Sequence, residues 1–236
     1  MAFRLHPHVA ARPPTGWVRV DLHSHTMWSG DSSTTADEVA RAVTAAGIDV
    51  LCITDHNTVD GARQLASRLP CRVIVGEEVR TAGGELIGLF LDERVPRGIP
   101  AGEAARRIRA QNGLVYVPHP FDATRHCLRP TDLADLVAAG LVDVVEVLNA
   151  NTSTPELNER AAAFAHEHGL APGAASDAHV PDAFGAAYVE VPDFDGPAAL
   201  LGALRHGRLV GHHFDAARPW EAHVVPSTRT SATRGR

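Results

Sequence analysis

A short segment near the N-terminus, VDLHSHT (20–26), carries two histidines at alternate positions. In an extended strand, alternate side chains point to the same side, so His23 and His25 would face a common point. Imidazole is a common ligand of transition metals, and the pair is therefore a candidate metal site. Such a pair also arises by coincidence, because the chain has 14 histidines among 236 residues. The interpretation depends on which other residues the fold brings to this pair.

Further residues that can bind metals follow apolar, strand-like segments along the chain. Imidazoles together with carboxylates suit zinc, manganese or iron, and a carboxylate can bridge two ions. Residues of this kind at the segment ends are His23 and His25, Asp55 and His56, Glu77 and Glu78, His119, Glu146 and Asn149, and Asp177 and His179. Any one of them alone has an ordinary structural explanation, but the whole set predicts a site for several metal ions.

Strand-like and helix-like segments alternate, which determines where these residues would lie. The strand-like segments are 18–23, 49–54, 71–76, 113–118, 142–147, 170–176 and 187–191, with 85–91 as a candidate extra strand. The helical patterns cover 34–46, 59–69, 103–111, 131–139, 155–168 and 197–206, and Gly47 is the expected C-cap of the first. This order favours a parallel sheet covered by helices, closed or nearly closed into a barrel. In such a barrel the carboxyl ends of the strands meet on one face, which would bring the polar residues together.

Length and composition fit one α/β domain, because 44% of the residues are hydrophobic. We predict an N-terminal arm at 1–16, a barrel domain at 17–225 and a disordered tail at 226–236. A net charge of −6 gives no strong signal for nucleic-acid binding. Lysine is absent, which excludes lysine nucleophiles and leaves arginine for anion recognition.

The predicted compartment is the cytoplasm. The three cysteines show no paired spacing, which fits a reducing environment. No apolar stretch reaches the roughly 18 residues of a membrane span, and the first residues lack the apolar region of a secretory signal. We therefore predict no membrane partner, and the sequence leaves the oligomeric state open.

The motifs resemble those of the PHP (polymerase and histidinol phosphatase) family of metal-dependent phosphoesterases. DLHSHT resembles the first family motif, ITDHN the second, VGEEV the glutamate motif of the third strand, VPHP the later histidine motif and SDAH the last. They occur in family order over residues 21–179. The resemblance implies a distorted (β/α)7 TIM-like barrel in a single domain, with two or three divalent ions of manganese, zinc or iron.

The resemblance also implies which residues bind these ions. The first ion would be held by His23, His25, Glu78 and Asp177, the second by Glu78 and His119, and the third by Asp31, His56 and His179. Glu78 is preferred to Glu77 because of its spacing from the preceding glycine. An alternative role for Asp31 is to cap the following helix. Many family members have a histidine where this chain has Asn149, which we predict as a weaker ligand of the second ion. The alternative for Asn149 is a hydrogen bond to substrate or to a loop.

Three further residues are predicted to act in catalysis. Arg80 follows the glutamate motif and Arg125 lies in the loop after VPHP, where a guanidinium can bind phosphoryl oxygens. For each, the alternative is an ordinary surface arginine. Asp55 is the third, with hydrogen bonds to loop amides as its alternative.

The predicted function is hydrolysis of a small phosphorylated metabolite or nucleotide, either a monoester or a cyclic or other diester. Metal ions would neutralise the phosphate charge and activate a water molecule. One alternative is a metal-dependent hydrolase of carbon–nitrogen or carbon–oxygen bonds. Another is a non-catalytic module that metal ions stabilise, which the nearly complete ligand set disfavours.

Overall fold

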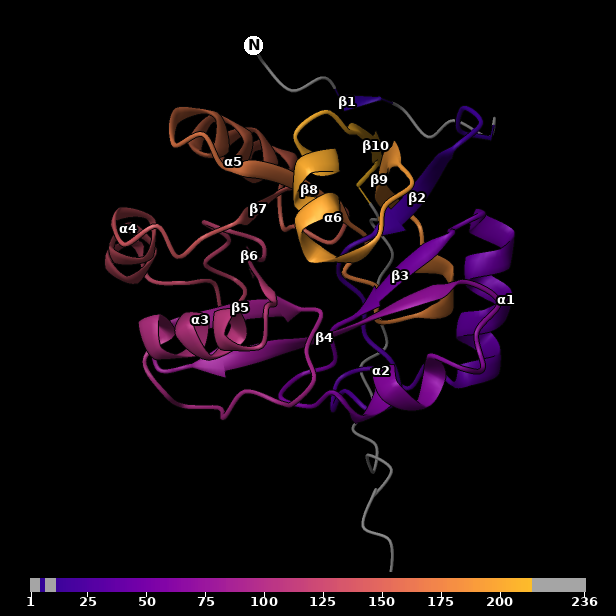
Figure 1. Cartoon of the computed structure of the whole chain (residues 1–236), viewed down its shortest axis with the longest axis horizontal. Coiled ribbons are helices and arrows are strands. Elements are labelled where there is room, and N and C mark those ends of the chain that lie inside the picture. The colour runs from indigo at the N-terminus through magenta and orange to yellow at the C-terminus, as the bar shows by residue number, and fades with distance from the viewer. Residues whose placement is uncertain (1–4, 7–11, 214–236) are drawn as a thin grey trace, which may run out of the picture.

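The computed structural model describes residues 5–6 and 12–213, and it shows one sheet with helices around it (Figure 1). The predicted tail at 226–236 and residues 1–4 and 7–11 of the predicted arm lie outside the described residues. In spatial order the strands are β1 (Leu5–His6), β10 (Arg208–Gly211), β9 (Ala187–Pro192), β2 (Trp17–Asp21), β3 (Val50–Ile53), β4 (Arg72–Thr81), β5 (Gly84–Leu89), β6 (Leu114–Val117), β7 (Val144–Asn149) and β8 (Ala171–Ala175).

The helices are α1 (Ala36–Ala46), α2 (Asp60–Leu65), α3 (Ala101–Ala110), α4 (Pro130–Ala138), α5 (Pro155–Glu167) and α6 (Gly196–Leu204), with a short 3-10 helix, η1 (Pro181–Ala183). Helix α2 is shorter than its predicted range, because residues 66–68 form a turn instead. Among the described residues, no helix has both the length and the apolar character needed to cross a membrane.

The sheet curls into a nearly closed barrel, which confirms the predicted fold class. Strands β2, β3 and β4 pair in parallel, and so do β6, β7 and β8. Just beyond the ends of β2 and β8, Ser24 forms a parallel bridge with Ala178. The carboxyl ends of these strands therefore meet, and the bridge lies at the same end.

Two strands depart from the predicted parallel order. Strand β5 is antiparallel to both β4 and β6, and β9 is antiparallel to β2. Only Ala82 and Gly83 separate β4 from β5, and a two-residue turn joins only antiparallel strands. The connection from β8 to β9 contains only the three-residue η1, not the crossover helix that a parallel pair normally uses. The barrel is therefore of mixed rather than uniform strand direction.

Local sequence explains where α1 begins and ends. The Thr35 side chain accepts a hydrogen bond from the backbone N–H of Glu38, whose carboxylate accepts one from the Thr35 N–H. This capping box starts the helix at Ala36, slightly later than predicted. The predicted cap Gly47 ends it at φ 68°, a left-handed conformation that glycine adopts without strain.

Candidate metal centre

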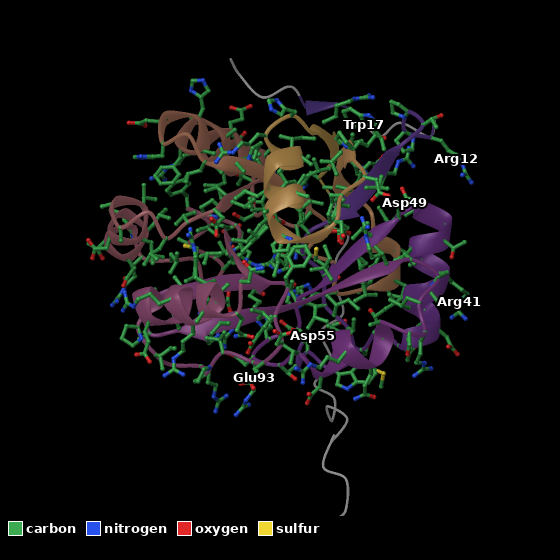
Figure 2. The ribbon with its side chains drawn as sticks, viewed as in Figure 1. Arg12, Trp17, Arg41, Asp49, Asp55 and Glu93 are labelled. Atoms are coloured by element: carbon green, nitrogen blue, oxygen red, sulfur yellow. The ribbon has the colours of Figure 1, made fainter. Side chains whose placement is uncertain are left out.

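The predicted ligands lie at the carboxyl ends of the parallel strands, inside the molecule. His23 and His25 follow β2, Glu78 lies in β4, and Asp177 follows β8. These side chains are all buried, although they are polar or charged. Asp55, which is also buried, lies within the outline of the fold in Figure 2, whereas Arg12 and Arg41 lie at its edge.

The first cluster brings four predicted ligand atoms together. His23 Nε2 lies 2.9 Å from His25 Nε2, and Glu78 Oε2 lies 3.2 Å from both nitrogens. Asp177 Oδ1 lies 3.6 Å from His23 Nε2 and 3.4 Å from His25 Nε2. Ligand atoms held tetrahedrally about 2.1 Å from one ion are about 3.4 Å apart. The four atoms therefore surround a volume of the size that one ion needs.

The other predicted ligands form two adjoining groups. Glu78 Oε1 lies 3.0 Å from His119 Nε2, and these two residues group with His23. Asp31 Oδ2 lies 3.1 Å from His56 Nε2 and 3.2 Å from His179 Nε2. The group of Asp31, His56 and His179, for the third ion, also includes His25. The structure thus brings together all of the histidines and carboxylates predicted as ligands, while their coordination of metal stays a prediction.

Unsatisfied atoms inside the cluster fit a bound cation. Asp177 Oδ1 is buried and makes no hydrogen bond, although nitrogens of His23, His25 and His179 lie within 3.6 Å. A buried carboxylate oxygen without a hydrogen bond is costly. An ion among these atoms would satisfy it, and the mixture of imidazole and carboxylate suits zinc, manganese or iron.

The electrostatics of the cluster also favour positive charge. Burial acts to lower the pKa of His25, but Asp177 and Glu78 beside it raise the pKa to about 10. Burial acts to raise the pKa of Glu78, but His23 and His56 hold it well below its usual value. The buried carboxylates therefore draw a proton onto His25, and a metal ion would take the place of that proton.

The backbone bends sharply at two of the predicted ligands. His119 has φ 27° and Asp177 has φ 49°, in the left-handed region that is unfavourable for residues other than glycine. Such positions cost about 1–3 kcal/mol each and occur often at functional sites. The His119 N–H donates to Glu146 Oε2 at 2.5 Å, and the Asp177 N–H donates to the His23 carbonyl at 2.9 Å. These hydrogen bonds hold the two turns in place.

Glu146, which the sequence placed at a strand end without a specific role, and Ser29, which was not predicted, orient the histidines of the site. Glu146 in β7 lies 3.1 Å from His23 Nδ1 and also accepts from Tyr116 Oη at 2.8 Å. Ser29 Oγ lies 3.2 Å from His25 Nδ1. Such partners fix the ring orientation of a histidine whose other nitrogen faces a metal. A buried glutamate in the otherwise apolar strand VVEV was a usable signal for Glu146, whereas nothing in the sequence distinguished Ser29.

Asn149 adopts the hydrogen-bonding role that was the alternative to metal binding. Its Oδ1 accepts from the Asn151 N–H at 2.6 Å, and its Nδ2 donates to Glu146 Oε2 at 2.8 Å and to Asp177 Oδ2 at 3.2 Å. The oxygen that would bind an ion is therefore engaged by a loop amide. In this arrangement Asn149 supports Asp177, and its coordination of an ion stays a prediction.

Asp55 makes the hydrogen bonds that were the structural alternative to its predicted catalytic role. Its two carboxylate oxygens accept from the Thr26 N–H at 2.6 Å and from Thr26 Oγ1 at 2.8 Å. Asp55 thus holds the turn that follows the two histidines. Helix α2 packs so closely here that a Cβ on Gly61 would lie 2.2 Å from Asp55 Oδ2, which explains the glycine.

The two predicted arginines differ in their relation to the cluster. Arg125 reaches the cluster from the loop after β6, where its Nη2 pairs with Asp177 Oδ2 and its Nη1 donates to the Asn151 carbonyl at 3.4 Å. The Arg80 side chain is half exposed at the rim and pairs with Glu85 at 3.0 Å. Of the two, only Arg125 directly contacts a predicted ligand of the first ion.

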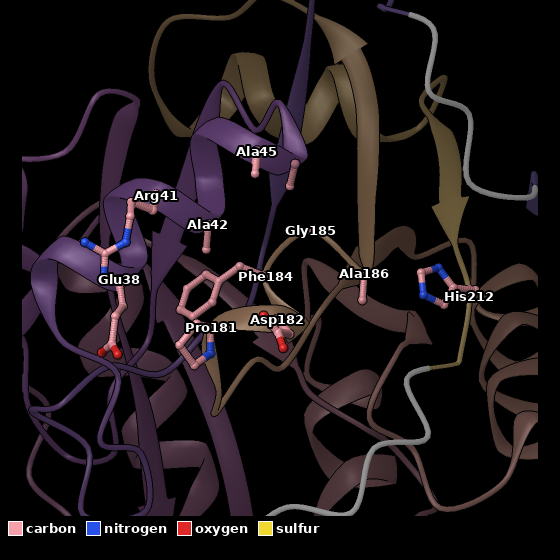
Figure 3. Close-up of a pocket in the computed structure, with 11 residues that line it drawn as sticks. Glu38, Arg41, Ala42, Ala45, Pro181, Asp182, Phe184, Gly185, Ala186 and His212 are labelled. Carbon is pink, nitrogen blue, oxygen red and sulfur yellow. The ribbon is translucent and has the colours of Figure 1, made fainter.

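Two pockets differ in their position relative to the cluster. One, of about 570 Å³, is lined by His56 of the third group together with Trp28, Arg94 and Arg97, so it adjoins the cluster. The other, of about 590 Å³, has Arg41 and other α1 residues on one side and His212 on the other (Figure 3). None of the predicted site residues lines this second pocket. The first pocket is therefore the candidate position for a substrate.

Asp21 of β2 binds the segment after β8, and its replacement is expected to destabilise the fold. Its carboxylate accepts from the Ser176 N–H at 2.9 Å, Ser176 Oγ at 2.6 Å and the Gly185 N–H at 3.2 Å. Asp21→Ala would leave these buried donors unpaired, so the free energy of unfolding should fall by about 3 kcal/mol or more. Urea unfolding followed by circular dichroism measures this loss. The exposed Asp37→Ala is the control, and a change within about 0.5 kcal/mol for both variants would contradict the prediction.

Comparisons with known proteins agree with this geometry. Residues 21–123 match the PHP domain, and residues 155–209 match the PHP-associated region. Two uncharacterized proteins of Methanocaldococcus jannaschii are each 34% identical to this chain. MJ0417 aligns over 80% of this chain and 79% of its own length, and MJ1587 over 56% and 82%.

A solved structure shares the fold. It is a two-domain protein from Bacteroides vulgatus that contains a predicted PHP-like metal-dependent phosphoesterase, with a TM-score of 0.64 and 21% identity. The match covers 83% of this chain, which spans 65% of that protein. The PHP and PHP-associated matches together cover most of the chain and agree with the clustered ligands, and this chain belongs to the PHP family.

Proposed function

We propose that this chain is a metal-dependent phosphoesterase that hydrolyses a small phosphorylated metabolite or nucleotide, as a monoester or as a cyclic or other diester. The observation that carries the proposal is the arrangement around Asp177. One of its oxygens faces His23 and His25 without a hydrogen bond, and the other pairs with Arg125. A cation position and an anion-binding guanidinium therefore adjoin the same carboxylate, an arrangement that suits an anionic phosphate ester.

The chain's own residues would then have separate tasks. Divalent ions held by the clustered ligands would neutralise phosphate charge and lower the pKa of water. Arg125 would bind a non-bridging phosphoryl oxygen and stabilise the charge that develops on it. Glu146 and Ser29 would keep the imidazoles of His23 and His25 correctly oriented. The pocket beside His56, of about 570 Å³, has room for a small substrate.

We also propose that the enzyme acts in the cytoplasm on a small phosphorylated substrate, with neither a membrane nor a nucleic acid as partner. Its three cysteines are all free, as a reducing compartment would keep them. The net charge of −6 gives no electrostatic reason to expect a polyanionic partner.

Substrate and metal assays test the proposal. Protein supplied with manganese or zinc should release p-nitrophenol from p-nitrophenyl phosphate or bis-p-nitrophenyl phosphate. Chelation should lower the rate at least about 100-fold, and added manganese should restore it, because the ions supply the charge neutralisation. Cleavage of p-nitroacetanilide or p-nitrophenyl acetate alone would favour hydrolysis of carbon–nitrogen or carbon–oxygen bonds. Metal binding without turnover of any of these probes would favour a non-catalytic module.

A further inference from the structure

We infer that Glu85 is a further ligand of the metal centre, for the second ion beside Glu78 and His119. No family motif that the sequence matches includes this residue, which lies in the antiparallel strand β5. The inference rests on the metal centre of the proposed function but is independent of which bond the enzyme cleaves.

The position of Glu85 is that of a ligand rather than of a surface carboxylate. Its side chain is only 3% exposed. Its Oε2 lies 3.9 Å from His119 Nε2, and its Oε1 lies 3.7 Å from His56 Nδ1. Glu85, Glu78 and His56 also form a group whose ligand atoms all lie within 4.8 Å of one another. Glu85 therefore faces the cluster at the position between the second and third ions.

The negative charges of Glu85 and the neighbouring Glu78 also favour a bound cation. Glu78 and Glu85 are two buried carboxylates in close proximity, an arrangement that is unfavourable unless positive charge lies between them. Arg80 supplies part of this charge, because its Nε and Nη2 both donate to Glu85 Oε1, at 3.2 and 3.0 Å. Arg80 thereby orients the carboxylate, and Oε2 is the oxygen that remains directed toward His119.

A ligand from β5 would complement the second ion's ligand set, because the hydrogen bonds of Asn149 already engage its side chain. The Asn149 oxygen accepts a hydrogen bond from a loop amide, and its Nδ2 donates to Glu146 and Asp177. Strand β5 is the neighbour of β6 on the side away from β7, so Glu85 approaches His119 from the opposite direction. A carboxylate from β5 would take the place of the histidine that many family members have at the position of Asn149.

Metal counting tests the inference directly. After loading with manganese and dialysis, Glu85→Gln should retain one ion fewer per chain than the unmodified protein, as measured by inductively coupled plasma mass spectrometry. Its affinity for that ion, measured by competition with a fluorescent chelator, should fall at least about 100-fold, because loss of a direct ligand should exceed the effect of losing an orienting residue. Adding Asn149→His to Glu85→Gln should restore the lost ion. The exposed Glu159→Gln on α5 is the control and should keep every ion.

Each outcome is decisive for Glu85. Loss of no ion, or of every ion, in a folded Glu85→Gln protein would overturn the inference, and so would failure of Asn149→His to restore binding. If Glu85→Gln does not fold, Glu85→Asp keeps the charge and should retain the ion with lower affinity, and unchanged affinity would again overturn the inference. A protein that shows the expected ion counts but cleaves no phosphate ester would contradict the proposed function alone.

Discussion

Replacing His25 by alanine is expected to lower hydrolysis of p-nitrophenyl phosphate at least about 100-fold, more than losing a residue that only orients a ligand. His25 belongs to both the first and the third groups of ligand atoms, so its loss weakens two ion positions. Its Nε2 is 3.2 Å from Glu78 Oε2 and 3.4 Å from Asp177 Oδ1, and alanine would leave both carboxylates with one cationic partner fewer. Initial rates at saturating manganese, together with ion counts per chain, measure the effect.

The control for this variant is His206→Ala, since His206 is exposed beyond the end of α6. It should leave the rate and the number of bound ions unchanged. If His25→Ala kept both the full rate and every ion, His25 would be neither a metal ligand nor needed for the reaction. Full activity with a reduced ion count would place the reaction at an ion that His25 does not bind.

Replacing Arg125 by methionine is expected to lower kcat about 100-fold, the effect typical of losing one group that stabilises transition-state charge. The reason is its position, because Arg125 pairs with Asp177 Oδ2 and is the predicted arginine that contacts the cluster. Methionine keeps the unbranched, apolar part of the side chain and removes the charged guanidinium. Arg125→Lys should recover only part of the rate, since an ammonium group cannot bind a phosphoryl group bidentately.

Ion counts distinguish two roles of Arg125, binding of the substrate phosphoryl group and neutralisation of Asp177. A slow Arg125→Met variant that keeps all its ions supports contact with substrate. An unchanged kcat would reduce Arg125 to a counter-ion of Asp177. The exposed Arg106→Met on α3 is the matched control, and its kcat and ion content should equal those of the unmodified protein.

Much of the fold was predictable because its signals are local. The alternation of apolar strands and helices predicted the barrel, and Gly47 predicted the end of α1. The directions of β5 and β9 were not predicted. The direction of a strand depends on the length of the connection before it and on whether that connection contains a helix. The two residues Ala82 and Gly83 form a hairpin turn that the alternation of strands and helices does not indicate.

The metal-binding residues were predictable for a different reason. Imidazoles and carboxylates placed directly after apolar strands are expensive to bury, so their repetition indicated one shared site. Asp55 and Asn149 satisfy the same pattern but serve as hydrogen-bonding supports. Glu85 was overlooked because it lies in a strand that the parallel pattern does not include.

The sequence by itself determined which side chains can bind metal and on which end of the strands they lie, because residue type and strand period are local properties. Only the tertiary structure decided which atoms face one another. Asn149 turns its oxygen to a loop amide, Glu85 of the antiparallel strand β5 lies 3.9 Å from His119, and Arg125 pairs with Asp177. These contacts depend on loop paths and on the closure of the barrel, and such long-range relations leave no periodic pattern in the chain.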